Sequence, residues 1–296
     1  MTMRGTWIWL RPGALPRVEE CLPHLDGVVI PLHNRRGAVH YGPTLRRWIR
    51  DWTDAGRPWW AMDHLTGPVR HHLPDLFARA QDIGAAGVMV DAEPDAGWRD
   101  RVREATSYRH DCAELRGGLD LAVTDYARGG IGTPTLSALL DEVDGHRPIG
   151  VPQSYDPGAS YEPDYHARSV AYWRSCGAER VVLGVGAWLR SRKRHRTPEE
   201  LRRHIEHVPA DVDGLCAWYA DDDALDDGDA DTADDLLPVL GAWPGRRVGH
   251  RSTEPAPADQ LDAAIAELEV IATRLKATHP VEADRVASLA RWLSLR

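Results

Sequence analysis

Residues 87–94 read Gly87-Val88-Met89-Val90-Asp91-Ala92-Glu93-Pro94, a short apolar run that ends in two carboxylates. It is the fourth of eight strand-like runs, which are set off by glycine or proline and separated by helix-sized intervals. The runs are 6–10, 27–32, 58–62, 87–90, 119–124, 148–152, 180–185 and 214–218. Because they are nearly continuous rather than alternating, they are typical of parallel strands that are covered on both faces.

Amphipathic stretches fill the intervals and predict the helices that return the chain between strands. They are 41–55, 73–84, 98–115, 135–143, 165–176 and 197–207. Eight such units predict an α/β fold, a (β/α)8 barrel of the TIM type, over residues 1–247. A doubly wound open sheet is the weaker alternative. No GxGxxG or GxxxxGK[ST] motif follows a strand, so the sequence does not indicate a nucleotide site.

The end of the chain has a different pattern. Residues 248–258 contain Pro255 and Pro257 and predict a linker. Apolar residues then recur at helical spacing and predict a C-terminal helical extension over 259–296. They are Leu261, Ile265, Leu268, Ile271 and Leu275, followed after Pro280 by Val286, Leu289, Trp292 and Leu293. Packing of this extension on the barrel, self-association and docking to a larger assembly all stay open.

The composition argues against several partners. The formal net charge is −9, whereas nucleic-acid binding proteins usually carry a basic surface. No stretch approaches the roughly 20 apolar residues that cross a bilayer, and the N-terminus does not predict a signal peptide. We therefore expect a cytoplasmic chain that binds neither nucleic acid nor membrane. The four cysteines are far apart and form no CxxC pair, which favours reduced, buried thiols.

In barrels of this type the chemistry lies at the carboxyl ends of the strands, where the loops converge. Three acidic positions and several aromatic residues follow the predicted strands. This composition is typical of a sugar-cleaving groove, in which carboxylates transfer protons and aromatic rings stack on sugar faces. The residues that we predict to bind substrate are Trp9, Asp63, Asp125, Tyr126, Gln153, Trp188, Trp218 and Tyr219.

The pair Asp91 and Glu93 is the strongest signal. The two-residue period of a strand places both carboxylates on the inward side if the extended backbone continues to Glu93. Two like charges there raise the pKa of one of them, as a general acid requires. The alternative is that a cation such as Arg128 keeps both ionised. Single aspartates at strand ends also cap helices, and Trp188 and Trp218 could simply fill the barrel mouth.

These motifs together resemble the retaining barrel glycosidases of the chitinase type (family 18) and the lysozyme type (family 25). The likeness covers most of residues 6–245 as architecture, and about ten residues as motif. By this resemblance Glu93 is the general acid/base, and Asp91 orients the N-acetyl group whose carbonyl oxygen is the internal nucleophile. Tyr155 would bond that acetamido group, Asp156 would support it, and Trp218 would floor the subsite.

The sequence also departs from both families. Family 18 chains carry further aspartates before Asp-x-Glu, where this chain has Met89, and family 25 chains end the first strand in an aspartate, where this chain has Trp9-Leu10-Arg11. A divergent member is implied. We expect cleavage of an N-acetylated glycan without a cofactor. Peptidoglycan is favoured over chitin, because the absence of a signal peptide fits a lysin released by lysis, a phage or an injection apparatus.

Two other functions stay open. The barrel could be a catalytically silent module that binds glycans or joins a larger assembly. It could also be a metal-dependent hydrolase using His33, Asp63, His64 and Asp91, although the first strand lacks the HxH of amidohydrolases; His33 and His64 are more often scaffold residues. The basic run 190–196 and the acidic run 221–235 predict solvated loops, and the acidic run lacks the spacing of a calcium loop.

Overall fold

The computed structural model describes residues 3–10, 15–34, 37–38, 42–64, 68–94, 97–155, 164–189, 194–218, 232–243 and 276. The chain divides into two compact units, Met1–Gly249 and His250–Arg296. The predicted linker at 248–258 and the predicted helices at 259–296 lie outside the described residues, apart from Lys276. None of the described helices has the length and apolar character needed to cross a bilayer.

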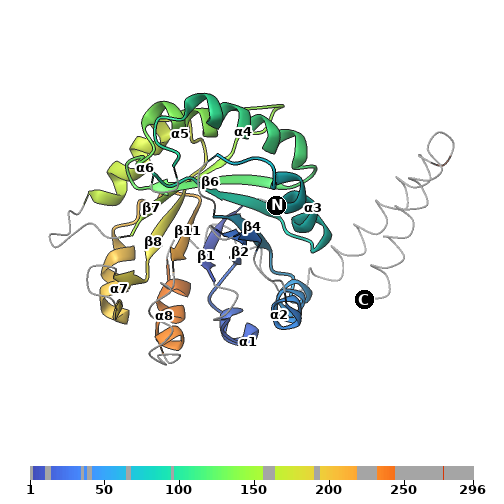
Figure 1. Cartoon of the computed structure of the whole chain (residues 1–296). Coiled ribbons are helices and arrows are strands. Elements are labelled where there is room, and N and C mark those ends of the chain that lie inside the picture. The colour runs from blue at the N-terminus through green and yellow to red at the C-terminus, as the bar shows by residue number, and fades with distance from the viewer. Residues whose placement is uncertain are drawn as a thin grey trace. The chain divides into compact units, whose positions relative to one another are not determined.

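Among the described residues, eight parallel strands close into a barrel, and most of them can be followed by their labels in Figure 1. They are β1 (Gly5–Trp9), β2 (Gly27–Asn34), β4 (Trp59–Asp63), β5 (Gly87–Asp91), β6 (Asp120–Tyr126), β7 (Ile149–Ser154), β8 (Val182–Gly186) and β11 (Gly214–Trp218). Closure comes from β1, which pairs with β11 on one side and with β2 on the other. This pairing confirms the predicted barrel and excludes the open sheet.

A helix follows each barrel strand, and the helices surround the strands in Figure 1. They are α1 (Val18–Cys21), α2 (Pro43–Asp54), α3 (Leu73–Asp82), α4 (Val102–Leu115), α5 (Thr133–Leu140), α6 (Tyr165–Ser175), α7 (Pro198–Glu206) and α8 (Thr232–Gly241). Short strands are inserted twice: β3 (Gly37–Ala38) pairs antiparallel with β2, and β9 (Trp188–Leu189) pairs with β10 (Arg194–His195).

The predicted strands agree with the observed ones to within two residues at each end. The helices α1 and α8 were not predicted. Helix α8 corrects the expectation that the acidic run 221–235 is entirely a loop, because the helix begins at Thr232. The physical reason is that the apolar side chains of the helix, just beyond that run, are buried in the core. They are Leu236, Leu237, Val239 and Leu240.

Two tryptophans fill the inside of the barrel. Trp7 of β1 and Trp60 of β4 meet edge to face, with ring centroids 6.2 Å apart. Glycines face both rings: a Cβ on Gly27 would lie 2.3 Å from the Trp7 ring, and one on Gly87 would lie 2.7 Å from the Trp60 ring. The lumen is therefore a packed core, and a ligand has access only to the layer above it.

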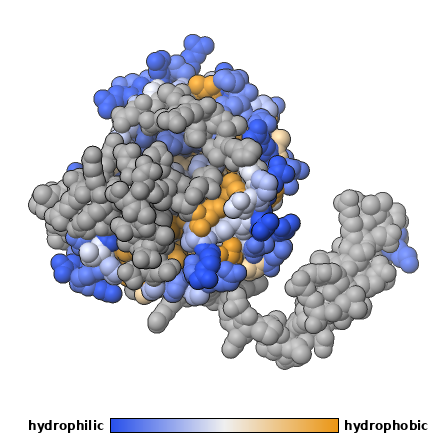
Figure 2. All heavy atoms as spheres, turned by 60° about the horizontal axis from the view of Figure 1, so that its bottom comes forward, coloured by the Kyte–Doolittle hydropathy of each residue, from blue (hydrophilic) through white to orange (hydrophobic). Residues whose placement is uncertain are grey.

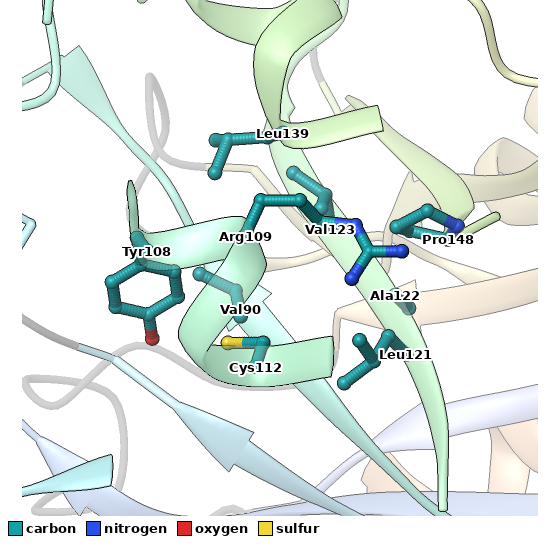
Figure 3. A pocket seen from close by; sticks show the side chains of 9 residues that line it. All are labelled: Val90, Tyr108, Arg109, Cys112, Leu121, Ala122, Val123, Leu139 and Pro148. Atoms are coloured by element: carbon teal, nitrogen blue, oxygen red, sulfur yellow. The ribbon is translucent and has the colours of Figure 1, made fainter. Parts of the chain in front are cut away.

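A second apolar layer lies between the strands and the helices, and the four cysteines are free and buried, as predicted. A cavity of about 10 Å³ lies in this layer, and Figure 3 shows the side chains that line it, most of them from β5, β6, α4 and α5. That volume suits at most one water molecule, so this cavity is not a substrate site. On the face shown in Figure 2, apolar surface forms small areas among hydrophilic residues.

Candidate functional site at the barrel mouth

The carboxylates of Asp91 and Glu93 lie together where β5 ends. Asp91 is 4% exposed. It lies two residues after Met89, which belongs to the core inside the barrel, so the Asp91 side chain also points inward. The backbone N–H of Ala92 donates to Thr124 O at 2.8 Å, so the chain stays beside β6 for one residue past the strand. Glu93 therefore returns to the side of Asp91, as the two-residue period predicted.

Both oxygens of Asp91 have a partner. Gln153 Nε2, from β7, donates to Asp91 Oδ1 at 3.0 Å, and His64 Nε2 lies 3.4 Å from Asp91 Oδ2. One side-chain ligand atom from each of His64, Asp91 and Glu93 lies within 4.8 Å of the others. These contacts hold the Asp91 carboxylate in one orientation beside Glu93.

Three aromatic rings from different strand ends form a row across the mouth. The Tyr155 and Trp218 rings stack with centroids 5.2 Å apart at 16°. Trp218 stacks in turn on Trp9, at 5.9 Å and 22°. The rings cover part of one another's faces, but all three side chains are only half-buried, so the row keeps apolar surface beside the carboxylates.

The row is possible because β8 has glycine at two positions. Gly184 and Gly186 lie opposite Cys216 and Trp218 of β11. A Cβ on Gly184 would lie 3.3 Å from Tyr155 Cε1 and 2.8 Å from Pro152 O. Because the strand between them lacks side chains here, the Tyr155 ring reaches across β8 to Trp218.

Arg196 supports the aromatic row by binding the backbone of β8 and of Tyr155. Its side chain is 8% exposed; Nε donates to Gly186 O at 2.7 Å and Nη2 donates to Tyr155 O at 2.8 Å. This corrects the expectation that the basic run 190–196 is solvated throughout, because its last arginine is buried against two backbone carbonyls. The run's residues 190–193 and the acidic run's residues 221–231 lie outside the described residues.

Burial raises the pKa of the Tyr155 hydroxyl well above its usual value, and the charges of Cys216, Asp91 and Glu93 add to the rise. Tyr155 therefore stays protonated at ordinary pH and can donate a hydrogen bond. Tyr126 lies near Pro94, the residue after Glu93: a Cβ on Gly130 would be 2.8 Å from Tyr126 Cδ2 and 2.7 Å from Pro94 Cγ.

Asp63 does not lie with these residues. It is 0% exposed, and its side chain lies on the same face of β4 as those of Trp59 and Ala61, which point toward the helices. Its Oδ2 accepts from Tyr108 Oη at 2.5 Å and lies 3.0 Å from His72 Nε2. A carboxylate enclosed in this way has no surface for a glycan, so the placement does not fit the predicted substrate contact.

Asp125 also faces outward, with the parity of Leu121 and Val123. It is 0% exposed, and its Oδ2 accepts the Ile131 N–H at 3.2 Å. Burial raises the pKa of Asp125 to about 7; backbone hydrogen bonds oppose the rise and the charge of Glu93 adds to it. Asp125 is thus an electrostatic neighbour of Glu93 inside the barrel wall, without a face toward substrate.

The remaining predicted residues are only partly described. Trp188 lies in β9, and its side chain is outside the described residues, as are Asp156 and Tyr219. The guanidinium of Arg128 lies over the Tyr165 ring, 5.4 Å from its centroid. From the sequence, His64 was grouped with Asp91 only in the metal-site alternative, Arg196 was expected only as part of the solvated run 190–196, and Gly184 was not singled out. The available signals were the strand-end position of His64 and the Gly-x-Gly of β8.

The described residues contain two groups that could hold a metal ion. One is His64, Asp91 and Glu93 at the mouth, and the other is His33, Asp63 and His72 behind the wall. The predicted set of His33, Asp63, His64 and Asp91 is therefore divided between two places. Asp63 and His64 are adjacent at the end of β4, but Asp63 belongs to the group behind the wall and His64 to the group at the mouth.

No protein-family model matches the chain, and no curated protein matches its sequence. Solved structures do match. A family 18 chitinase of Pseudoalteromonas aurantia has a TM-score of 0.57 at 14% identity, covering 77% of this chain and 98% of its own. A second family 18 chitinase, from Flavobacterium johnsoniae, has a TM-score of 0.53 at 12% identity. The match covers 81% of this chain and 94% of the chitinase chain.

A family 2 β-galacturonidase of Eisenbergiella tayi has a TM-score of 0.54 at 11% identity, covering 83% of this chain and 52% of its own. The shared feature is the barrel. At this identity the likeness shows the fold alone, and enzymes that act on different sugars match about equally well. Any chemistry therefore depends on the residues at the mouth and not on the fold.

Proposed function

We propose that the chain is a glycoside hydrolase in which Glu93 is the general acid/base. The observation that carries this proposal is the Asp91–Glu93 pair beside the aromatic row. Glu93 is half-buried, so it keeps a surface toward a ligand, whereas Asp91 is fixed by Gln153 and His64. A half-exposed acid next to an oriented carboxylate is the arrangement that protonates a glycosidic oxygen while a second charge is held in place.

The spacing of the pair supports a retaining reaction. Inverting enzymes separate their two carboxyl groups by about 6.5–9.5 Å to admit a water molecule. An oxygen of Asp91 and an oxygen of Glu93 lie within 4.8 Å. This proximity favours, for Asp91, the role of orienting a substrate acetamido group that attacks as internal nucleophile over the role of a distant base.

The protonated Tyr155 hydroxyl supports the same substrate class. It can donate to the acetamido carbonyl, while Trp218 and Trp9 extend the apolar surface past it. We infer that the substrate is an N-acetylated glycan, with peptidoglycan preferred over chitin, and that Asp156, Trp188 and Tyr219 also contribute to its binding.

The test is incubation of the protein with peptidoglycan and with N-acetylglucosamine oligomers, with mass spectrometry of the released reducing ends. Glu93→Gln should lose cleavage by at least about 100-fold, because general acid catalysis is worth about that much. Glu206→Gln, on an exposed residue of α7, is the matched control and should cleave like the parent. Equal cleavage by parent and Glu93→Gln would refute the proposal.

Two other outcomes favour the alternatives. If neither protein cleaves but both sediment with insoluble glycan, the barrel is a silent binding module. If cleavage occurs only with a divalent cation and disappears with a chelator, the group of His64, Asp91 and Glu93 is a metal site and the reaction is metal-dependent hydrolysis.

A further inference from the structure

We propose that His33, Asp63 and His72 form a structural binding site for a divalent transition-metal ion, with zinc as the best fit. The three residues come from the end of β2, the end of β4 and the residue before α3. An ion there would fasten three separate elements behind the barrel wall. The proposal does not depend on the glycosidase activity.

The separations of the ligand atoms fit one ion. His72 Nε2 lies 3.0 Å from Asp63 Oδ2, and His33 Nδ1 lies 3.8 Å from Asp63 Oδ1. A tetrahedral zinc ion with bonds of about 2.0 Å keeps its ligands about 3.3 Å apart, and one ligand atom from each of the three residues lies within 4.8 Å of the others. Two imidazoles and one carboxylate are a donor set that zinc accepts, whereas magnesium and calcium prefer oxygen alone.

The cluster also contains buried polar atoms that need a partner. Among the described residues, His33 Nδ1 and Asp63 Oδ1 accept or donate no hydrogen bond, although both atoms are buried. They face each other at 3.8 Å, too far for a hydrogen bond but suitable for two ligands of one ion. A buried polar atom without a partner destabilises the folded state, so an ion that binds both atoms is favoured.

Asp63 is also held as metal-binding carboxylates usually are. Its other oxygen, Oδ2, accepts from Tyr108 Oη, and this leaves Oδ1 directed at His33. Figure 3 shows Tyr108 on α4 with its hydroxyl directed away from Arg109 and the small cavity. Groups that hydrogen-bond a ligand in this way fix its orientation and raise the affinity for the ion.

Burial indicates a structural rather than a catalytic ion. The side chains of His72 and Asp63 are 8% and 0% exposed, and that of His33 is 15% exposed. The rings of His33 and His72 pack with centroids 4.5 Å apart, which leaves little room for a substrate. The next residue after Asp63 is His64, which contacts Asp91. An ion on Asp63 would thus steady the strand end that supports the mouth.

The experiment uses the full-length chain without a tag, stripped with a chelator and then titrated with Zn²⁺ by calorimetry and with Co²⁺ by visible absorption. We expect one ion per chain and a cobalt band of tetrahedral intensity. His72→Gln should weaken binding at least about 100-fold, and Tyr108→Phe, which removes only the hydroxyl on Asp63, about 10- to 100-fold. His71→Gln is the matched control, because His71 is the exposed neighbour of His72 and should leave binding unchanged.

Glu93→Gln separates this site from the group at the mouth. Binding that survives Glu93→Gln and fails in His72→Gln supports the proposal. No bound ion, binding that Glu93→Gln abolishes, or binding that His72→Gln leaves intact would each overturn it. Circular dichroism checks that every variant is folded; if His72→Gln is not, His33→Gln decides the question by the same criteria.

Discussion

Asp125 is a buried carboxyl group whose protonation is coupled to folding. Its pKa is about 7 in the folded protein and about 3.8 when the chain is unfolded. The folded state therefore binds more protons than the unfolded state between these values, and stability falls as the pH rises through this window. Below pH 4 both states are protonated and the penalty is absent; above pH 7 it is complete.

We predict that Asp125→Asn removes this dependence. The asparagine carbonyl can still accept from the Ile131 N–H, so the loop contact survives. In urea unfolding, the stability of Asp125→Asn relative to the parent should rise by about 2–3 kcal/mol between pH 5 and pH 8, since one pKa unit corresponds to about 1.4 kcal/mol. An unchanged difference at the two pH values would show that Asp125 is already ionised in the folded protein.

Arg196 is predicted to matter through its donors rather than its charge. Arg196→Met keeps the length of the side chain but leaves Gly186 O and Tyr155 O without this donor. We expect a loss of about 2–4 kcal/mol in the free energy of unfolding, together with weaker glycan binding, because Tyr155 loses its brace. Arg202→Met, on an exposed arginine of α7, should change the stability by less than about 0.5 kcal/mol.

The residues at the mouth were predictable only where a simple periodicity applied. Asp91 and Glu93 are two apart, so any continuation of the strand places them together. Asp63 and Asp125 also end strands, but they lie on the outward parity, and a one-residue difference in parity turns a side chain to the other face. At His33 the pairing register shifts after Pro31, which no sequence pattern indicated.

Among the elements, β8 decides how the aromatic row forms. Two of its inward positions are glycines, Gly184 and Gly186. The sequence alone does not reveal their role, because a glycine inside a strand usually weakens it. Here the missing side chains create the space that Tyr155 occupies. Helix α8 was not predicted, because the charged run that precedes it suggested a loop. The helix is stabilised instead by its own apolar residues, which pack on the core.

We predict that Gly184→Ala disturbs the row and the strand together. The new methyl group would lie 2.8 Å from Pro152 O and 3.3 Å from the Tyr155 ring, so both must shift. A loss of about 1–3 kcal/mol in stability is expected, with reduced glycan affinity. Gly118→Ala is the control, because nothing lies within 4 Å of its Cβ position. Equal affinities of the two variants would show that the row does not bind the glycan.

At the scale of the whole molecule, the barrel was predictable because eight repeats of one pattern reinforce each other. An error of two residues at a strand end does not change the number of units or the direction of the chain. The same regularity explains why enzymes with different substrates share the fold at 11–14% identity. Closure needs only the alternation of strands and helices, whereas activity depends on a few residues above the tryptophan-filled lumen.

The division of the chain leads to the last prediction. The unit Met1–Gly249 contains every barrel strand, and the buried core residues of the described chain end at Trp243. We therefore expect a chain of residues 1–249 to fold alone, with a thermal midpoint within about 2 °C of the full chain, since 1 kcal/mol moves the midpoint of a unit this large by about 2–4 °C. Glycan cleavage should also survive, because the mouth residues all belong to this unit. A large fall in the midpoint would show that residues 250–296 stabilise the barrel, and loss of an oligomer with cleavage unchanged would assign them to assembly.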